Sequence, residues 1–129
     1  NAPLNEPPAE VVVSENETLV ALKVADEEAL VGRITELENV LLNETASMEE
    51  KNNAYEELQT INKNEATKET IEKLLKSNYN LDSYIKIDGN NIKVTIASQT
   101  HDTKLANDII RSIQNLYDQD MYITVKFNN

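Results

Sequence analysis

Apolar residues recur at helical spacing along the first third of the chain. This periodicity predicts one long helix over residues 18–44, whose apolar stripe is formed by Leu30, Ile34, Leu37 and Leu41. Such a helix is about 40 Å long at 1.5 Å per residue. We therefore expect its N-terminal half to project beyond the core. Gly32 lies in its interior, where a bend or a close packing contact would explain a glycine.

A polar turn separates this helix from the next predicted one. Ser47 and Glu50 have the spacing of a capping box, in which each side chain bonds the backbone N–H of the other residue. We therefore expect a second helix over residues 48–62, with Tyr55 on its inward face.

A third helix is predicted over residues 68–78. Thr67 precedes it and is suited to accept from the free N–H groups of its first turn. Either Asn78 or Asn80 is expected to adopt the left-handed conformation that ends the helix. The sequence thus predicts a break between residues 62 and 68.

Three segments of alternating polarity follow the helices. Residues 84–98, YIKIDGNNIKVTIAS, alternate on both sides of a DGNN turn, which is typical of a β-hairpin. Residues 121–127, MYITVKF, predict a third strand, and between them a helix is expected over residues 103–118 with Asp102 as its N-cap. The polar face of the sheet is expected to be open to water and carries Lys86, Lys93, Thr95, Tyr122, Thr124 and Lys126.

The predicted fold class is α+β. Residues 67–127 have the order α-β-β-α-β, with a three-stranded sheet packed on two helices and preceded by a long N-terminal helix and a second helix. The helical crossover makes the third strand parallel to the second. We expect the first strand to lie between these two, which leaves free edges at residues 92–97 and 121–127.

The first 17 residues differ in composition from the rest. Residues 1–17 contain all three prolines and four glutamates, so they predict an extended linker. The domain is then residues 18–129, with two helices over 18–62 and the sheet-bearing core over 67–127. The chain lacks an initiator methionine and a signal peptide, so we expect it to be a fragment of a longer protein.

The net charge of −11 is confined to one half of the chain. Residues 1–57 carry 14 acidic and 3 basic residues, whereas residues 58–129 carry 9 of each. An acidic surface repels phosphate backbones and argues against nucleic-acid binding. It is either a solvated face or an electrostatic guide for a basic partner surface.

Few residues suggest catalysis or metal binding. The chain has no cysteine, a single histidine, His101, and two glycines far apart. These exclude a thiolate zinc site and a glycine-rich phosphate loop. An enzyme would depend on carboxylates such as Glu27, Glu28 and Asp102. We predict no catalytic residue, metal or cofactor, and favour a binding or assembly module.

From about Ala21 to Phe127, the sequence resembles the extracytoplasmic domain of the stage III sporulation protein AH family of endospore-forming bacteria. Residues 49–96, EEKNNAYEELQTINKNEATKETIEKLLKSNYNLDSYIKIDGNNIKVTI, are similar to its paired helices and hairpin. NIKVTIASQTHDTKLANDII resembles its second strand and the next helix, and MYITVKF its terminal strand.

This resemblance implies the ring-building fold of the inner-ring proteins of type III secretion systems and flagellar basal bodies. It implies a membrane anchor in the outer forespore (mother-cell) membrane and a domain facing the intermembrane space. The implied partner is the extracytoplasmic domain of stage II sporulation protein Q. With that partner, a ring of copies would form a channel between mother cell and forespore, and residues 1–17 would be the membrane-proximal linker.

The predicted free edges suggest where a partner binds. An open edge can accept a strand from a neighbouring copy or from a partner. Lysines on the polar face could instead only guard the edges against aggregation, and a monomeric extracytoplasmic adaptor without a ring is the alternative function. The candidate partner-binding residues are Ile92, Lys93, Val94, Thr95, Tyr122, Thr124 and Lys126 on the strands, with Arg33 and Glu36 on the long helix.

Overall fold

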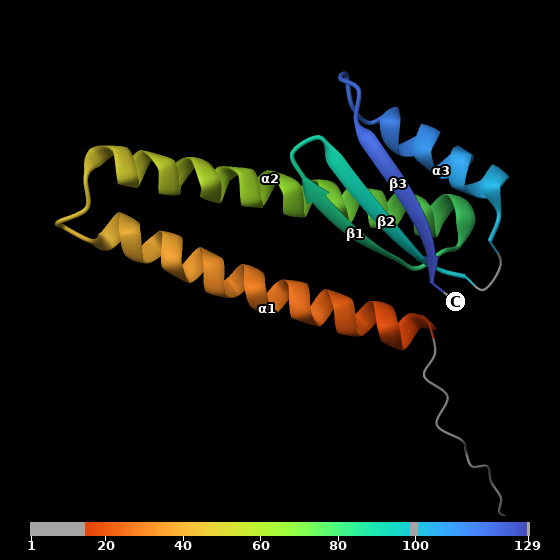
Figure 1. Cartoon of the computed structure of the whole chain (residues 1–129), viewed down its shortest axis with the longest axis horizontal. Helices are drawn as coiled ribbons and strands as arrows, with labels where there is room; N and C mark the ends of the chain where they lie inside the picture. The colour runs from red at the N-terminus through yellow and green to blue at the C-terminus, as the bar shows by residue number, and fades with distance from the viewer. Residues whose placement is uncertain (1–14, 99–100, 129) are drawn as a thin grey trace, which may run out of the picture.

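The computed structural model describes residues 15–98 and 101–128, in which two long helices precede a small sheet and its helix (Figure 1). The elements are α1 (Glu15–Leu42), α2 (Met48–Tyr79), β1 (Ser83–Asp88), β2 (Asn91–Ala97), α3 (Thr103–Gln114) and β3 (Tyr122–Asn128). This is the predicted α+β class, and the predicted α-β-β-α-β order along the chain is confirmed.

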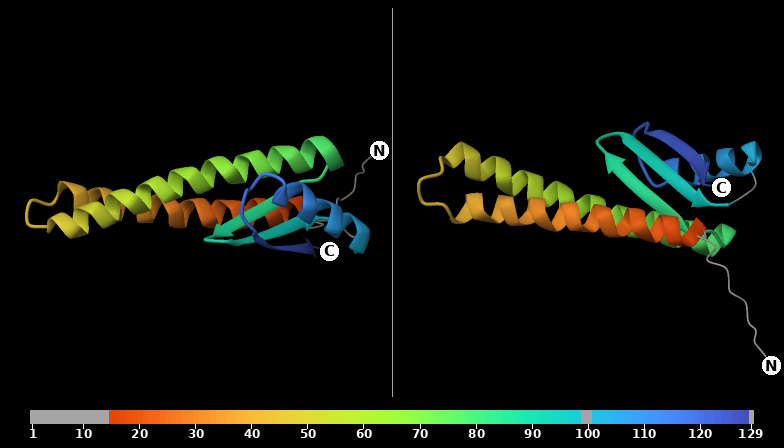
Figure 2. Two further views of the ribbon diagram at one scale, coloured as in Figure 1. Left: turned by 90° about the horizontal axis from the view of Figure 1, so that it is seen from above. Right: turned by 60° about the horizontal axis from the view of Figure 1, so that its bottom comes forward.

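Helices α1 and α2 run side by side as an antiparallel hairpin (Figure 2). The predicted break between residues 62 and 68 is wrong, because α2 is continuous over 32 residues. No proline or glycine interrupts residues 48–79. Thr67, expected as a cap, instead donates from its hydroxyl to the Lys63 carbonyl oxygen at 3.0 Å, a bond that leaves the helix intact.

The half of α1 that projects is the opposite of the half we expected. Its N-terminal half lies beside the sheet and contacts β1 and β2, while its C-terminal half extends with the start of α2 beyond the sheet (Figure 2). The stripe accounts for this pairing: Leu37 is buried and faces α2, where Ala54 is also buried. Gly32 has no atom within 4 Å of the position a Cβ would occupy, so close packing does not explain it.

The predicted helix ends are mostly confirmed. The Ser47 hydroxyl accepts from the Glu50 N–H at 3.0 Å, and the Ser47 N–H donates to the Glu50 carboxylate at 2.7 Å. Asn80 ends α2 in the left-handed conformation with φ 55°. Asp102 caps α3 by accepting from the Leu105 N–H at 3.1 Å. However, α3 ends at Gln114, not at residue 118.

The sheet has the order β1-β2-β3. β1 pairs antiparallel with β2, and β3 pairs parallel with β2, as the crossover predicted. The expected position of the first strand between the other two is wrong, since β2 is central and β1 and β3 are the edges. The physical reason is coverage: with β3 next to β2, α3 packs on β3 while α2 packs on β1, so both helices share one apolar face.

The core lies between that apolar face and the two helices. Each fully buried aliphatic side chain stabilises the fold by about 1.5–3 kcal/mol. The core residues are Ile71 and Leu75 of α2, Ile85 of β1, Ile92, Val94 and Ile96 of β2, Ile109 and Ile113 of α3, and Ile123 of β3.

The predicted linker over residues 1–17 falls largely outside the described residues, which begin at residue 15. Residues 15–17 belong to α1. Within the described part of the chain, no helix is both long enough and apolar enough to cross a membrane.

Candidate protein-protein interfaces

The polar face of the sheet carries its side chains in register. One row across the strands is Lys86, Lys93 and Thr124, and the next row toward the hairpin turn is Asp88, Asn91 and Tyr122. The side chains of both rows are exposed, and Tyr122 is 73% exposed. The face becomes half-buried farther from the hairpin turn, at Tyr84 and Thr95 in the next row and at Ala97 and Asn128 in the row after it. The face predicted to be open to water is therefore exposed in the two rows nearest the hairpin turn.

β3 presents a free edge beside this face. Within the described residues it pairs with β2 alone, and the Tyr122 N–H donates to the Asn90 carbonyl at 2.7 Å. Because successive residues of a strand direct their backbone groups to opposite sides, Ile123, Val125 and Phe127 direct N–H and C=O away from the sheet. These groups are available to pair with an added strand.

The predicted edge at residues 92–97 does not exist. β2 pairs with β1 on one side and β3 on the other, so its backbone groups are already used. Ile92 and Val94 are also buried in the core, at 0% and 1% exposure. Of the candidates on this strand, only Lys93 is fully exposed, and Thr95 is half-buried. The alternation of apolar and polar residues is consistent with the burial of Ile92 and Val94, but it does not show which strand is central in the sheet.

Arg33 and Glu36, the candidates on the long helix, are engaged within the molecule. Arg33 donates from Nε and Nη2 to the two carboxylate oxygens of Glu57 at 2.6 and 2.8 Å, and from Nη1 to Glu36 at 2.9 Å. The hydrogen bonds and charge of Glu57, with those of Glu36, raise the pKa of Arg33 above its ordinary value. The same hydrogen bonds lower the pKa of Glu57. These residues join α1 to α2, a role the sequence did not indicate.

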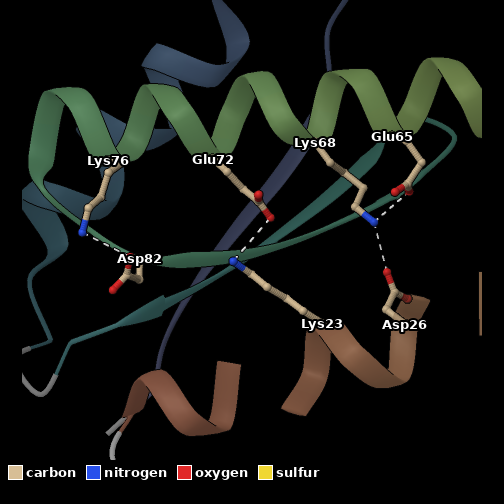
Figure 3. A network of polar contacts seen from close by, with 7 residues as sticks. All are labelled: Lys23, Asp26, Glu65, Lys68, Glu72, Lys76 and Asp82. Atoms are coloured by element: carbon tan, nitrogen blue, oxygen red, sulfur yellow. Dashed lines mark hydrogen bonds and ion pairs between the residues drawn. The ribbon is translucent and has the colours of Figure 1, made fainter. Parts of the chain in front are cut away.

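Polar side chains also fix α1 against α2, and one pair joins α2 to the segment just before β1. Figure 3 shows them: Lys68 bonds Asp26 at 3.1 Å and Glu65 at 2.8 Å, Lys23 lies 3.7 Å from Glu72, and Lys76 lies 3.2 Å from Asp82. All of these residues except Lys76 and Asp82 line a cleft of about 410 Å³ between the two helices, and Tyr84 and Ile85 of β1 also line it.

Lys68 is the centre of this network, and its side chain is only 18% exposed. Burial lowers the pKa of its ammonium, but the bonds to Glu65 and Asp26 outweigh that effect and raise it overall. Burial, followed by the negative charge of Asp26, raises the pKa of the Tyr84 hydroxyl. This network is structural, because its charges are satisfied by one another. Sequence reasoning missed it, since Asp26 and Lys68 are 42 positions apart.

The far end of the helical hairpin exposes large apolar side chains. Leu42 is 79%, Met48 74% and Tyr55 55% exposed. The inward position predicted for Tyr55 is therefore wrong, and Ala54 takes the buried place beside it. Met48 and Tyr55 are seven residues apart and share one face of α2. We call Leu42, Glu44, Met48, Tyr55 and Glu56 the distal tip.

The described residues include no group of three His, Asp or Glu side chains placed to hold a metal ion. His101 lies before α3, and its ring meets that of Phe127 edge-on, with centroids 5.1 Å apart. The contact joins the start of α3 to the end of β3.

The fold and these surfaces define an α+β domain with an open sheet face, a free parallel edge strand and a projecting helical hairpin. The chain belongs to the SpoIIIAH-like protein family, whose model matches residues 4–123. This confirms the resemblance found in the sequence.

A chain of the solved structure of the SpoIIQ-SpoIIIAH pore forming complex has the same fold. Its TM-score is 0.74 at 22% sequence identity, over 86% of this chain and 96% of that chain. No curated protein matches this chain in sequence.

Proposed function

We propose that this chain is a non-enzymatic assembly protein of endospore formation. It binds the extracytoplasmic domain of SpoIIQ and assembles into a ring or channel between mother cell and forespore. The observation that carries the proposal is its membership of the SpoIIIAH-like protein family over residues 4–123. The fold it shares with a chain of the SpoIIQ-SpoIIIAH pore forming complex supports the same role.

The free edge of β3 is the proposed site for SpoIIQ. A partner strand would pair with the outward N–H and C=O groups of Ile123, Val125 and Phe127, and main-chain bonds of this kind supply affinity. Tyr122, Thr124 and Lys126 project from the same strand onto the open face, and Lys126 would contact side chains of SpoIIQ. Of the partner-binding residues expected from the sequence, these three and Lys93 remain candidates. Ile92 and Val94 are buried and Thr95 is half-buried, while Arg33 and Glu36 are paired within the molecule.

The proposed location is the intermembrane space of the engulfed forespore. In this arrangement the domain is carried by a protein anchored in the outer forespore membrane, and residues 18–129 form the ring-building domain. The start of α1 and the end of β3 lie at the same end of the molecule, opposite the distal tip (Figure 1). Because residues 1–17 are the proposed membrane-proximal linker, an anchored copy would direct its distal tip away from the outer forespore membrane.

Light scattering on a mixture of this domain with the SpoIIQ extracytoplasmic domain tests the proposal. A species with the summed mass of both proteins is expected, and two separate masses at high concentration would contradict it. The alternative, a monomeric adaptor, predicts the complex with SpoIIQ but no self-association at any concentration.

A further inference from the structure

The distal tip combines exposed apolar surface with unpaired negative charge. Residues 36–57 contain seven glutamates and one lysine. Within the described part of the chain, Glu44 and Glu56 are exposed and form no ion pair, whereas Glu36 and Glu57 pair with Arg33. Leu42, Met48 and Tyr55 supply the apolar centre. Apolar residues with a charged rim are the usual composition of a protein-protein contact.

The open sheet face carries two neighbouring lysines, with the exposed Asp88 one row nearer the hairpin turn. Lys86 and Lys93 lie directly opposite each other across β1 and β2, an arrangement of like charges that destabilises an isolated sheet. Lys86 is partly balanced by Asp26 at 3.8 Å. No carboxylate in the described residues pairs with Lys93, whose neighbours on β3 are Thr124 and, one row away, the exposed Tyr122. We call Lys86, Lys93, Tyr122 and Thr124 the lysine face.

We propose that the distal tip of one copy docks on the lysine face of a second copy. Glu44 and Glu56 then lie against Lys93 and Lys86, and Met48 and Tyr55 pack beside Tyr122. Lys93, which has no ion-pair partner among the described residues of one copy, gains one in the pair, as do Glu44 and Glu56, and this favours a second copy over an unrelated protein. This deepens the proposed function, since it assigns the contact between neighbouring subunits.

The far end of the α1–α2 hairpin and the three-stranded sheet lie apart along the molecule, as Figures 1 and 2 show. The contact is therefore heterologous, and each docked copy leaves one tip and one face free for the next copies. A contact of this type builds a ring where the rotation closes. It leaves the outer edge of β3 free for SpoIIQ.

Intermolecular paramagnetic relaxation tests the contact. The chain has no cysteine, so Asn53→Cys places a nitroxide label at the exposed distal end of one copy without competing thiols. This copy is mixed with ¹⁵N-labelled wild-type protein, which has no cysteine and carries no nitroxide. The mixture is at about 1 mM, where contacts with a millimolar Kd are populated. Broadening is expected at the amides of Lys93, Tyr122 and Thr124, and not on α3.

Charge reversal makes the test specific. Lys93→Glu in the ¹⁵N-labelled copy is expected to reduce the broadening about tenfold, because like charges then meet. Glu44→Lys with Glu56→Lys in the nitroxide copy is expected to restore it. The matched control is Lys73→Glu, an exposed lysine of α2 away from both surfaces, which should leave the broadening unchanged.

Three results would overturn the proposal: no broadening, broadening confined to the distal tip of the ¹⁵N-labelled copy, or a loss that the reversed tip does not restore. The second result would mean a symmetric tip-to-tip pair. Binding of SpoIIQ to the wild-type domain, measured separately, tells this failure from failure of the proposed function. A wild-type domain that binds SpoIIQ but shows no broadening between copies removes only the docking contact.

Discussion

Arg33 of α1 and Glu57 of α2, 24 positions apart, are joined by two hydrogen bonds of 2.6 and 2.8 Å between guanidinium and carboxylate. This bidentate pair crosses the hairpin in its projecting half. Between this pair and the distal end of the hairpin, Leu37 and Ala54 are the only buried apolar residues among those described. The pair therefore acts where packing is thin, and it holds the distal tip in place.

Arg33→Gln is expected to loosen the distal half of the hairpin without unfolding the sheet. Both residues are well exposed, so the effect on global stability is small. Local opening should increase instead, because projecting elements with few buried contacts open first. Amide hydrogen exchange of residues 34–58 is expected to accelerate, while that of β2 stays unchanged. Arg33→Lys, which keeps the charge but not the paired geometry, should give an intermediate rate.

The same pair gives a pH dependence of known sign. Arg33 lowers the pKa of Glu57 in the folded state, so the stabilisation is present above the ordinary glutamate pKa of about 4.3 and is lost as pH falls through the folded value. The difference in protection between wild type and Arg33→Gln should be large at about pH 6 and should shrink as the pH falls below about 4.3 and Glu57 becomes protonated. An unchanged difference at low pH would assign the effect to the packing of the Arg33 stem.

Lys68→Met is expected to destabilise the whole domain. The ammonium is mostly buried and bonds both Asp26 and Glu65, so its removal leaves Glu65 without its cation and Asp26 with only the longer contact to Lys86. Losing hydrogen bonds to charged groups costs about 1–3 kcal/mol. Urea unfolding followed by circular dichroism measures the change. Lys63→Met, an exposed lysine of the same helix without an ion pair among the described residues, is the control and should change stability by less than about 0.5 kcal/mol. Equal effects of both variants would contradict a special role of the network.

The two glycines are expected to respond in opposite directions to alanine. Gly32 lies inside α1 with free space around it, so Gly32→Ala should stabilise the domain by about 0.5–1 kcal/mol. Gly89 begins the hairpin turn at φ +61°, and Gly89→Ala should destabilise it by about 1–2 kcal/mol although no atom obstructs the added Cβ. Thermal unfolding of both variants checks this, and a destabilising Gly32→Ala would show that α1 needs its glycine for another reason.

Periodicity predicted the core well because burial on one face is written into each segment separately. Ile85, Ile92 and Val94 stand at apolar positions of the alternating strands and Ile109 at an apolar position of α3, and all four are buried. Strand order was mispredicted because it depends on where α3 returns the chain, and no local pattern encodes that choice. The break near Thr67 failed for a related reason: a threonine can cap a helix or bond back within one, and the surrounding sequence allowed both.

The candidate site was only partly predictable. Alternation correctly exposed Lys93, Tyr122, Thr124 and Lys126. It could not show that Arg33 is satisfied by Glu57, because pairing between distant helices depends on how the hairpin closes. Tyr55 was expected on the inward face of the helix, whereas its small neighbour Ala54 is the buried residue there.

Val125→Pro is expected to weaken SpoIIQ binding at least about tenfold while the domain stays folded. It removes an N–H that points away from β2, a position where an edge strand tolerates proline, and it blocks main-chain pairing with an added strand. Thr95→Pro is the contrasting variant. Thr95 lies on the central strand, so proline there removes a ladder bond and should unfold the sheet. Circular dichroism and binding of both variants separate the two effects, and full affinity in a folded Val125→Pro protein would exclude the β3 edge.

A calorimetric titration of this domain with the SpoIIQ extracytoplasmic domain, at low and at high salt, measures whether and how the two proteins bind. We predict a saturable 1:1 complex whose affinity changes little with salt, because main-chain bonds of β3 carry it. A steep loss of affinity at high salt would place the acidic half of the chain at the interface instead. No heat of binding at either salt concentration, with both proteins folded, would contradict the proposed function.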